Sequence, residues 1–406
     1  MRPLSKNLFS LLLVSSLLGL SLLVSMPLGL AQSGTNISGI IKENTTWTKA
    51  NNPYSLTGNV AVEKDVTLTI EPGVTVNLNG HYIRVNGTLI AIGRSLDNSI
   101  LFNSGSVEFT DESTGWDSQT GNGGIIKNAV INGSLTCYGS PMVSQNTIKG
   151  VISVNGGSPT INQNTLSGWI IVQAGSPIIS KNILLGGYSF GVGISSGNAI
   201  VVDNTISGSF PDAAVGVGGG SPTIERNLIS NDLSYGAPNN VQAGLRISGS
   251  SSPIIKQNTI IKNLIGIYLD GTPKPTIVNN NIEDNSDNVR LRPSTQVNIY
   301  AANNWWGTTD SAVIDQKIYD YNDDFNLGKV TFTPFLTEAN PQASPDPNAT
   351  IPTPSTDFAT PTSTSQNPTA TPIGLNWAEI VIIVLCGVMA VLLAIAFVFF
   401  KKKQKA

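Results

Sequence analysis

Metal-binding and disulfide-forming side chains are scarce in this chain. Its 406 residues include one histidine, His81, and two cysteines, Cys137 and Cys386. Cys386 falls in an apolar run that we expect to span a membrane, so it cannot pair with Cys137 in a disulfide. Copper prefers imidazole and sulfur ligands, and an exterior domain would offer only His81, Cys137 and Met142. This argues against a copper-binding role, and we expect His81 to be structural.

Charge and helical periodicity are also scarce. Charged residues make up 12% of the chain, and the net charge is −3 at pH 7. Nucleic-acid binding requires a basic surface, so the composition argues against nucleic acid as a partner. Between the apolar segments near the N-terminus and the C-terminus, apolar residues do not recur with a helical period. This absence excludes repeated strand–helix–strand units.

Both ends of the chain carry membrane signals. Arg2 and Lys6 precede an apolar run from Leu8 to Val24, and Ala31 suits a cleavage site, so residues 1–31 are predicted to be a signal peptide. An uncleaved anchor is the alternative.

The C-terminal end predicts a membrane anchor. Residues 377–400 contain an uncharged apolar run long enough to span a bilayer, and the lysine-rich tail 401–406 follows it. The predicted topology is a single pass with a short cytosolic tail and the rest outside the cell. A buried core helix is the alternative. Residues 336–376, rich in Pro, Thr and Ser, are predicted to be an extended stalk.

Asparagine recurs through the middle of the chain within a short motif. Segments such as Ser158–Leu166, Ser221–Ile229 and Ser252–Ile260 share the pattern Ser-Pro-x-Ile-x-x-Asn, followed by an apolar pair. A short repeat rich in Gly and β-branched residues predicts a solenoid. We expect the recurring asparagines to occupy left-handed corners and to hydrogen-bond along the stack. Nine of them share this phase: Asn128, Asn146, Asn164, Asn182, Asn204, Asn227, Asn258, Asn280 and Asn303.

A stack of coils needs covers at its two ends. We predict coils over 59–303, an N-terminal cap over 32–58 and a C-terminal cap over 304–335. Trp47 and Tyr54 would fill the N-terminal cap. The aromatic residues expected to fill the C-terminal cap are Trp305, Trp306, Phe325, Phe332 and Phe335. Stacking of sugars on the tryptophan pair is the alternative role.

Three passages resemble a known group of exported proteins. Val66–Val76 resembles the opening coils of right-handed parallel β-helix proteins, and the Ser-Pro repeats resemble those of the pectate-lyase-like superfamily. Asn303–Gly307 is similar to the segment that closes such helices on prokaryotic cell surfaces. The resemblance implies an all-β, right-handed parallel β-helix. It implies no particular activity, because the superfamily includes lyases, glycoside hydrolases, adhesins and proteins without known activity.

One predicted strand face carries a candidate binding site. In the strand two turns after each asparagine, the outward residues are first small and then become charged or aromatic. The loop 231–244, with Asp232 and Tyr235, would flank this patch. An aromatic ring among cationic and carboxylate groups suits an extracellular glycan or cell-wall component. An ordinary solvated face is the alternative. The predicted ligand-binding residues are Arg246, Tyr268, Asp270, Arg290 and Arg292.

Signals for catalysis and for metal binding are weak. A glycosidase needs two nearby carboxylates, and the patch offers only Asp270, so a polysaccharide lyase or hydrolase using Asp270 and Arg290 is the alternative function. No cofactor is predicted. Calcium is an open alternative at Asp320–Asp324, although Phe325 stands where a calcium loop has glycine. A second polar site is possible in 108–117, which contains Glu108, Asp111, Glu112, Trp116 and Asp117. The function predicted is a membrane-anchored, non-catalytic structural or glycan-binding module.

Overall fold

The computed structural model describes residues 34–94, 98–187, 189–231 and 241–345. The chain divides into the units Met1–Thr353 and Pro354–Ala406. The predicted signal peptide, membrane span and tail lie outside the described residues, as do Asp232 and Tyr235. Within the described ranges, the longest helices fall short of the length and apolar character needed to cross a membrane.

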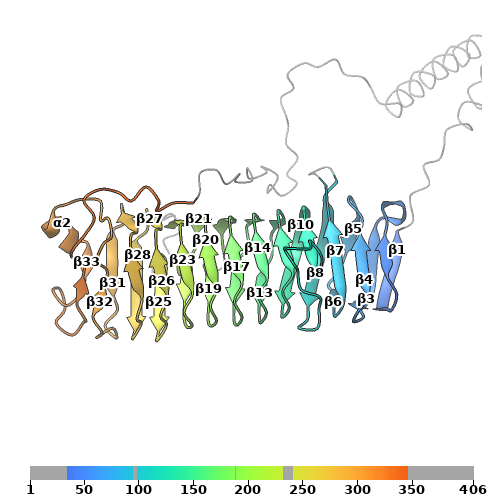
Figure 1. Cartoon of the computed structure of the whole chain (residues 1–406), viewed down its shortest axis with the longest axis horizontal. Coiled ribbons are helices and arrows are strands. Elements are labelled where there is room, and N and C mark those ends of the chain that lie inside the picture. Colours follow the sequence, from blue (N-terminus) through green and yellow to red (C-terminus); the bar gives the residue numbers. More distant parts are fainter. Residues whose placement is uncertain (1–33, 95–97, 188, 232–240, 346–406) are drawn as a thin grey trace, which may run out of the picture. The chain divides into compact units, whose positions relative to one another are not determined.

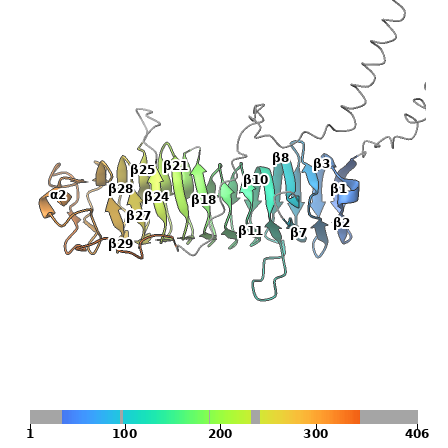
Figure 2. The ribbon, with the colours of Figure 1, turned by 90° about the horizontal axis from the view of Figure 1, so that it is seen from above.

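The described part of the first unit is a solenoid of stacked coils with three faces (Figures 1 and 2). Successive coils pair through parallel strands, and a coil contributes one short stretch of strand to each face. The first face is an 11-stranded sheet. The second and third faces belong to one 21-stranded sheet, because four long strands bend across both of them.

The first face contains β2 (Thr45–Trp47), β4 (Thr67–Ile70), β7 (Thr88–Ile92), β9 (Ile125–Lys127), β11 (Met142–Ser144), β14 (Thr160–Asn162), β17 (Ile178–Ser180), β20 (Ile200–Val202), β23 (Thr223–Glu225), β26 (Ile254–Lys256) and β29 (Thr276–Val278). The second face contains β5 (Thr75–Asn77), β12 (Thr147–Ile148), β15 (Thr165–Leu166), β18 (Ile183–Gly186), β21 (Thr205–Ser209), β24 (Leu228–Asn231), β27 (Thr259–Ile261) and β30 (Asn281–Glu283). The third face contains β6 (Tyr82–Val85), β13 (Ile152–Val154), β16 (Ile170–Val172), β19 (Phe190–Ile194), β22 (Ala213–Val217), β25 (Ala243–Gly249), β28 (Ile265–Gly271), β31 (Asp287–Leu291) and β33 (Ile318–Tyr319). The strands shared by the second and third faces are β1 (Thr35–Ile41), β3 (Tyr54–Val62), β8 (Ile100–Phe109) and β10 (Ala129–Cys137).

The core is a continuous column of aliphatic side chains. On the third face, Val215 and Val217 point inward and are buried, as are Leu245 and Ile247 in the next coil. This period of two is the one predicted from the sequence, and it arises because successive strand residues face opposite sides of a sheet. In-register stacking therefore places identical kinds of side chain above one another, and the core continues from coil to coil.

Buried asparagines form a second column between the first and second faces. Asn164 donates its backbone N–H and its side-chain amide to Oδ1 of Asn182, at 2.9 and 3.0 Å. Its other amide hydrogen reaches the carbonyl oxygen of Val143, at 2.9 Å. Buried amides are thereby fully satisfied, which removes the main cost of placing them there. The asparagine column consists of Asn146, Asn164, Asn182, Asn204, Asn227, Asn258, Asn280 and Asn304.

Both ends of this column differ from the prediction by one residue. Asn128 lies one residue before the column. The column position in that coil is occupied by Ala129, whose backbone N–H donates to Oδ1 of Asn146. At the other end Asn304, rather than Asn303, accepts from Asn280. Asn128 and Asn303 instead occupy the preceding corner position, with φ values of 51° and 58°.

The left-handed backbone conformation belongs to that corner position rather than to the column. The residue before each column asparagine has positive φ, including Gln163, Lys181 and Arg226. The prediction that the column asparagines turn the corner is therefore wrong. Their place is fixed by hydrogen bonds, while the exposed or half-buried neighbour adopts the left-handed turn.

The N-terminal segment is a coil of the solenoid and not a separate cap. β1 pairs in parallel with β3, and β2 pairs with β4. Trp47 and Tyr54 are buried and stack with their ring centroids 4.9 Å apart. The short 3-10 helix η1 (Lys49–Asn51) connects β2 to β3. The predicted cap at 32–58 is thus already part of the stack.

The C-terminal end is closed by irregular structure. It comprises the helix α2 (Ser311–Asp315), β33 and the two-stranded sheet of β32 (Ile299–Tyr300) and β34 (Val330–Thr331). Trp306 is buried and contacts Phe332 edge-on, as expected for cap core. Trp305 is half-buried and donates to Glu283, while Phe325 is 78% exposed, so the prediction that Phe325 fills the cap is wrong.

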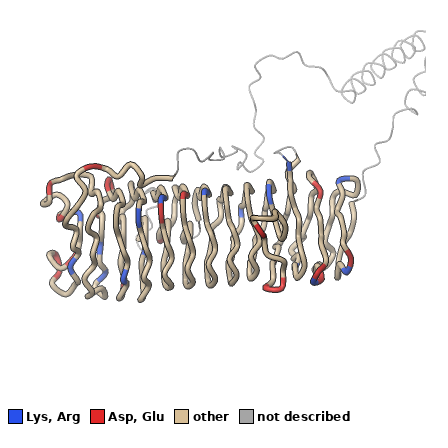
Figure 3. Tube along the Cα trace, in the orientation of Figure 1, with Lys and Arg blue, Asp and Glu red and all other residues tan. Residues whose placement is uncertain are grey.

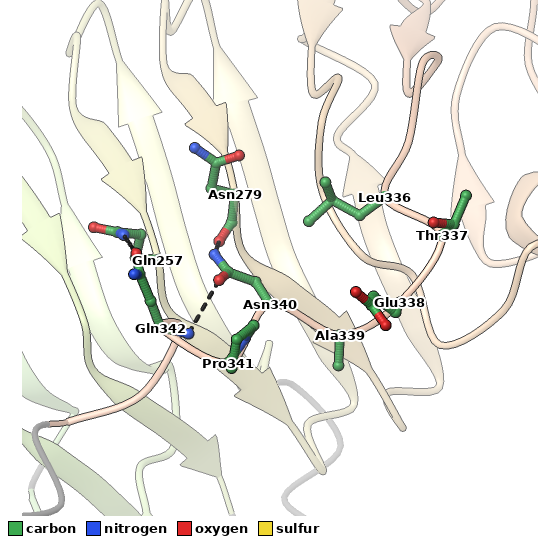
Figure 4. A pocket seen from close by; sticks show the side chains of 9 residues that line it. All are labelled: Gln257, Asn279, Leu336, Thr337, Glu338, Ala339, Asn340, Pro341 and Gln342. Carbon is green, nitrogen blue, oxygen red and sulfur yellow. Dashed lines mark hydrogen bonds between the residues drawn. The ribbon is translucent and has the colours of Figure 1, made fainter.

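Residues 336–345, predicted as the start of the stalk, pack back along the solenoid. We call this segment the strap. Asn340 exchanges two hydrogen bonds with Asn281, at 2.7 and 3.1 Å, and Gln342 accepts from Gln257. Figure 4 shows the strap crossing the coils beside Gln257 and Asn279, around a polar hollow of about 400 Å³. The predicted stalk boundary therefore lies too early by at least this segment.

Candidate functional site

The structure brings the five predicted ligand-binding residues together on the third face. Arg246, Tyr268 and Arg290 are register partners on β25, β28 and β31, so they form one outward column. Asp270 and Arg292 lie two residues further along β28 and just beyond β31. This arrangement is the one expected from aligning the coils, because residues one coil apart become neighbours in a parallel stack.

Carboxylates neutralise the arginines of this patch. Nη1 of Arg246 lies 2.6 Å from an oxygen of Asp212, and Nη2 lies 3.7 Å from Asp270. Arg292 makes a 2.6 Å contact with the same oxygen of Asp270, and Arg290 pairs with Asp287. Three arginines thus face three carboxylates, and the network is balanced in charge.

Asp212 and Asp287 were missed by the sequence reasoning. Asp212 immediately precedes β22, and Asp287 is the first residue of β31. Both therefore lie outside the strict alternation that selects outward residues in the strand middle. The sequence feature that could have identified them is an acidic residue at the start of two strands of the same face.

The local electrostatics keep Asp270 ionised. Partial burial alone would raise the pKa of the Asp270 carboxyl, but hydrogen bonds from Ser294 and Arg292 and the charges of Arg292 and Arg246 outweigh it. The pKa of Asp270 is therefore lowered. Burial raises the pKa of the Tyr268 hydroxyl, so this group stays a neutral donor. The patch therefore presents the ionised Asp270 carboxylate, the N–H donors of its arginines and a neutral phenol at neutral pH.

A hollow of about 350 Å³ adjoins Arg246 on the side towards β19. We call it the Phe190 hollow. Its volume lies at the small end of the range of about 300–1,000 Å³ that is usual for ligand sites. The residues that line it are Ile171, Phe190, Gly193, Ile194, Ser195, Gly216, Val217, Gly218, Arg246 and Ser248.

Small residues make the Phe190 hollow possible. The ring of Phe190 lies over Gly216 of the next coil, where an added Cβ would come within 2.4 Å of it. An added Cβ at Gly218 would have nothing closer than 3.8 Å, so the floor there is open. The hollow therefore has an aromatic wall, an arginine at one side, and the hydroxyl-bearing residues Ser195 and Ser248 along its lining.

The other candidate sites are not assembled into binding centres. Asp320 is buried, and its carboxylate accepts backbone N–H groups of Asn322 and Val330, so it staples a turn. In the part of the chain that the structure describes, no three His, Cys, Asp or Glu side chains are grouped as a metal ion would require. Figure 3 shows charged residues gathered towards the two ends of the stack.

The 108–117 segment divides between the sheet and a projecting loop, visible in Figure 2. Glu108 lies in β8 and pairs with Arg84 at 3.1 Å. Asp117 accepts from Gln119 and Thr120 within its own turn, and these hydrogen bonds lower its pKa. Glu108 and Asp117 thus already have structural partners, and Asp111 and Glu112 are exposed.

The comparisons with known proteins agree with this architecture. The family model described as "Right handed beta helix region" matches residues 195–314. The chain is a parallel β-helix repeat protein. The matched region begins after Phe190. It includes β22 and β25, which line part of the Phe190 hollow, and β28 and β31, which carry the arginine patch.

A curated protein matches a short stretch of this chain. It is "Protein bark beetle" of Drosophila melanogaster, 36% identical over 83 residues, or 19% of this chain. The match spans 3% of that protein's length. No solved structure matches the chain significantly. These similarities are to a fold and a repeat, and they bring no activity with them.

Proposed function

We propose that the chain is a membrane-anchored cell-surface β-helix that binds a glycan on its third face without chemically altering it. The observation that carries the proposal is the Phe190 hollow beside a charge-balanced arginine network. Aromatic side chains pack against the apolar face of a sugar ring, and arginine and serine side chains donate to its hydroxyl groups. The anchoring part of the proposal depends on the apolar run at 377–400 and the lysines that follow it.

Charge balance favours a neutral over a strongly acidic glycan. The three arginines of the patch already have carboxylate partners, so an anionic ligand would have to displace them. Hydroxyl groups can instead share these donors without breaking the pairs, because a guanidinium carries five N–H groups. The predicted preference is therefore for a hydroxyl-rich, uncharged sugar.

A glycan array with the detergent-solubilised full chain tests this function. Substituting Phe190→Ala together with Arg246→Ala should abolish the binding signal. A matched control exists in the same outward column at the N-terminal end, where Arg84 lies 5.3 Å from the ring of Tyr82 and pairs with Glu108. Tyr82→Ala with Arg84→Ala should leave binding unchanged. Equal loss in both double variants, or no binding by the parent protein, would reject the proposal.

A polysaccharide hydrolase or lyase is the second candidate, because Arg246 has two carboxylate partners. Asp212 and Asp270 both contact Arg246 and could flank a scissile bond. A hydrolase needs one carboxyl group with a raised pKa as general acid, whereas the pKa of Asp270 is lowered. Release of reducing ends or unsaturated uronates from a polysaccharide panel, lost in Asp270→Ala, would establish this alternative.

A further inference from the structure

The two ends of the coil stack differ. At the C-terminal end, α2, β34 and the aromatic cluster of Trp306 and Phe332 cover the last coil. At the N-terminal end, β1 is the outermost strand, as Figures 1 and 2 show. Within the described residues β1 pairs with β3 alone. Its outer edge therefore presents backbone N–H and C=O groups that no described strand satisfies.

β1 is chemically suited to pairing with another strand. From Thr35 to Ile41 it contains no charged residue and no proline, two of the usual devices against edge pairing. Its register with β3 shifts between Ile37 and Gly39, so the straight stretches that could pair are Thr35–Ile37 and Gly39–Ile41. Ile40 is 61% exposed, and Ile37 and Ile41 pack against the end of the core while remaining only partly buried. A strand that added to this edge would cover both the backbone groups and the partly exposed isoleucines.

We propose that β1 pairs with β1 of a second copy of this chain, so that two solenoids join end to end at their N-terminal coils. The closed C-terminal end prevents head-to-tail stacking, which would otherwise build open filaments. The alternative is an antiparallel pairing of β1 with β1 of the second copy about a two-fold axis. This pairing is self-complementary, because both copies use the same strand edge.

The length of the preceding chain supports a second copy as the occupant. If the predicted leader is removed after Ala31, Gln32 and Ser33 are all that precede the described residues. Two residues reach at most about 7 Å, whereas the seven residues of β1 extend over about 23 Å. The mature N-terminus is therefore too short to cover the edge. This step depends on leader removal, which mass determination of the purified protein checks separately.

The mass of the detergent-solubilised full chain, measured by light scattering over a concentration series, tests the proposal. The parent protein should double in mass with concentration. Ile40→Asp should remain monomeric, since the two-fold would bring two carboxylates together at the paired edge. Ile178→Asp provides the matched control, because Ile178 is a 41% exposed isoleucine in the middle of the first face. It should dimerise like the parent.

Two results would overturn the proposal. One is a parent protein that stays monomeric throughout the series. The other is a dimer that Ile40→Asp leaves intact, which would place the contact elsewhere, for example in the apolar run at 377–400. A disulfide between copies provides a second measurement: Ser38→Cys, in a Cys386→Ser background, should crosslink under oxidation, and Ser158→Cys should not. Neither measurement depends on glycan binding, so the proposed function and the dimer fail independently.

Discussion

Asn280 donates both its backbone N–H and its side-chain amide to a single acceptor, Oδ1 of Asn304, each at 2.9 Å. Asn304 in turn donates to the carbonyl oxygens of Ile277 and Ala301. The last coil is thereby joined to the asparagine column, although its neighbouring segments are irregular.

Replacing Asn304 by Ala should therefore destabilise the C-terminal coils by about 2–4 kcal/mol. The buried backbone N–H of Asn280 loses its acceptor, and the bonds that the Asn304 amide donates to Ile277 and Ala301 are also lost. Asn303→Gly is the matched control. Asn303 is exposed with φ 58°, a conformation that glycine adopts freely, so this change should alter stability by less than about 1 kcal/mol. Urea unfolding followed by circular dichroism measures both. A larger loss in Asn303→Gly than in Asn304→Ala would contradict the register described above.

In the middle of the column, a carboxylate should be tolerated less well than a small apolar side chain. Asn204 is fully buried and donates to Ile179, Val202 and Asn227. Asn204→Ala removes these bonds at a cost of about 3 kcal/mol or more. Asn204→Asp also removes the donors and adds a buried charge, so its loss of stability should be larger at pH 7. The difference should narrow as the pH is lowered and the new carboxyl group is protonated.

Gly216→Ala should act on the Phe190 hollow more than on the fold. The added methyl group would collide with the ring of Phe190, which must then turn outwards into the hollow. We expect a loss of glycan binding comparable to that of Phe190→Ala, with a stability change of about 1–3 kcal/mol. Gly115→Ala, outside the lining of the hollow, is the control, since an added Cβ there would have nothing closer than 3.5 Å. Retained binding in Gly216→Ala would show that the ring position is unimportant.

The buried thiol of Cys137 provides a pH-dependent reporter of folding. Burial raises its pKa from 9.0 to about 12, so the fold favours the neutral thiol. Its contribution to stability is complete below pH 9 and is lost as the pH rises from 9 towards 12. The parent protein should therefore lose stability over this range more steeply than Cys137→Ala. In the folded protein at pH 8, Cys137 should also resist a thiol reagent that labels it readily in urea. Equal slopes in the two proteins would contradict this assignment.

The strap should protect the flank of the solenoid. Asn340→Ala removes the side-chain hydrogen bond to the carbonyl oxygen of Asn279 and the one that Oδ1 accepts from the backbone N–H of Gln342. The two bonds with Asn281 use the backbone of Asn340 and are retained. We expect cleavage within 336–345 by limited proteolysis to become several-fold faster, while the coils themselves remain resistant. Glu338→Ala, at an exposed strap position, is the control. Unchanged cleavage in Asn340→Ala would mean that these contacts do not hold the strap.

The sequence predicts the solenoid because one chemical requirement recurs in every coil. The Ser-Pro-x-Ile-x-x-Asn segment fixes a strand start, an inward side chain and a buried amide, so Asn164, Asn227 and Asn258 could be aligned directly. At the ends the same reasoning was off by one residue. At the C-terminal end, Asn303 and Asn304 both carry a side-chain amide that could fill the same column position. At the N-terminal end, Ala129 has no side-chain amide. Only the hydrogen-bond partners distinguish these registers.

The candidate site was predictable in its column but not in its surroundings. Arg246, Tyr268 and Arg290 follow from strand alternation alone. The Phe190 hollow depends on an aromatic ring that crosses to the next coil above Gly216, and Asp212 enters from a strand start. The strap depends on Asn340 meeting Asn281, which lies 59 residues away. Such contacts follow from where the coils stand in space, and local sequence patterns do not encode them.

The spacing of Asn146, Asn164 and Asn182 is 18 residues at each step. A tandem duplication of one such segment would insert a complete turn whose amide meets its neighbours as before. The rod would grow by about 4.8 Å, the distance between paired strands. Duplication of such segments would therefore change the distance between the Phe190 hollow and β1 in fixed steps of one coil.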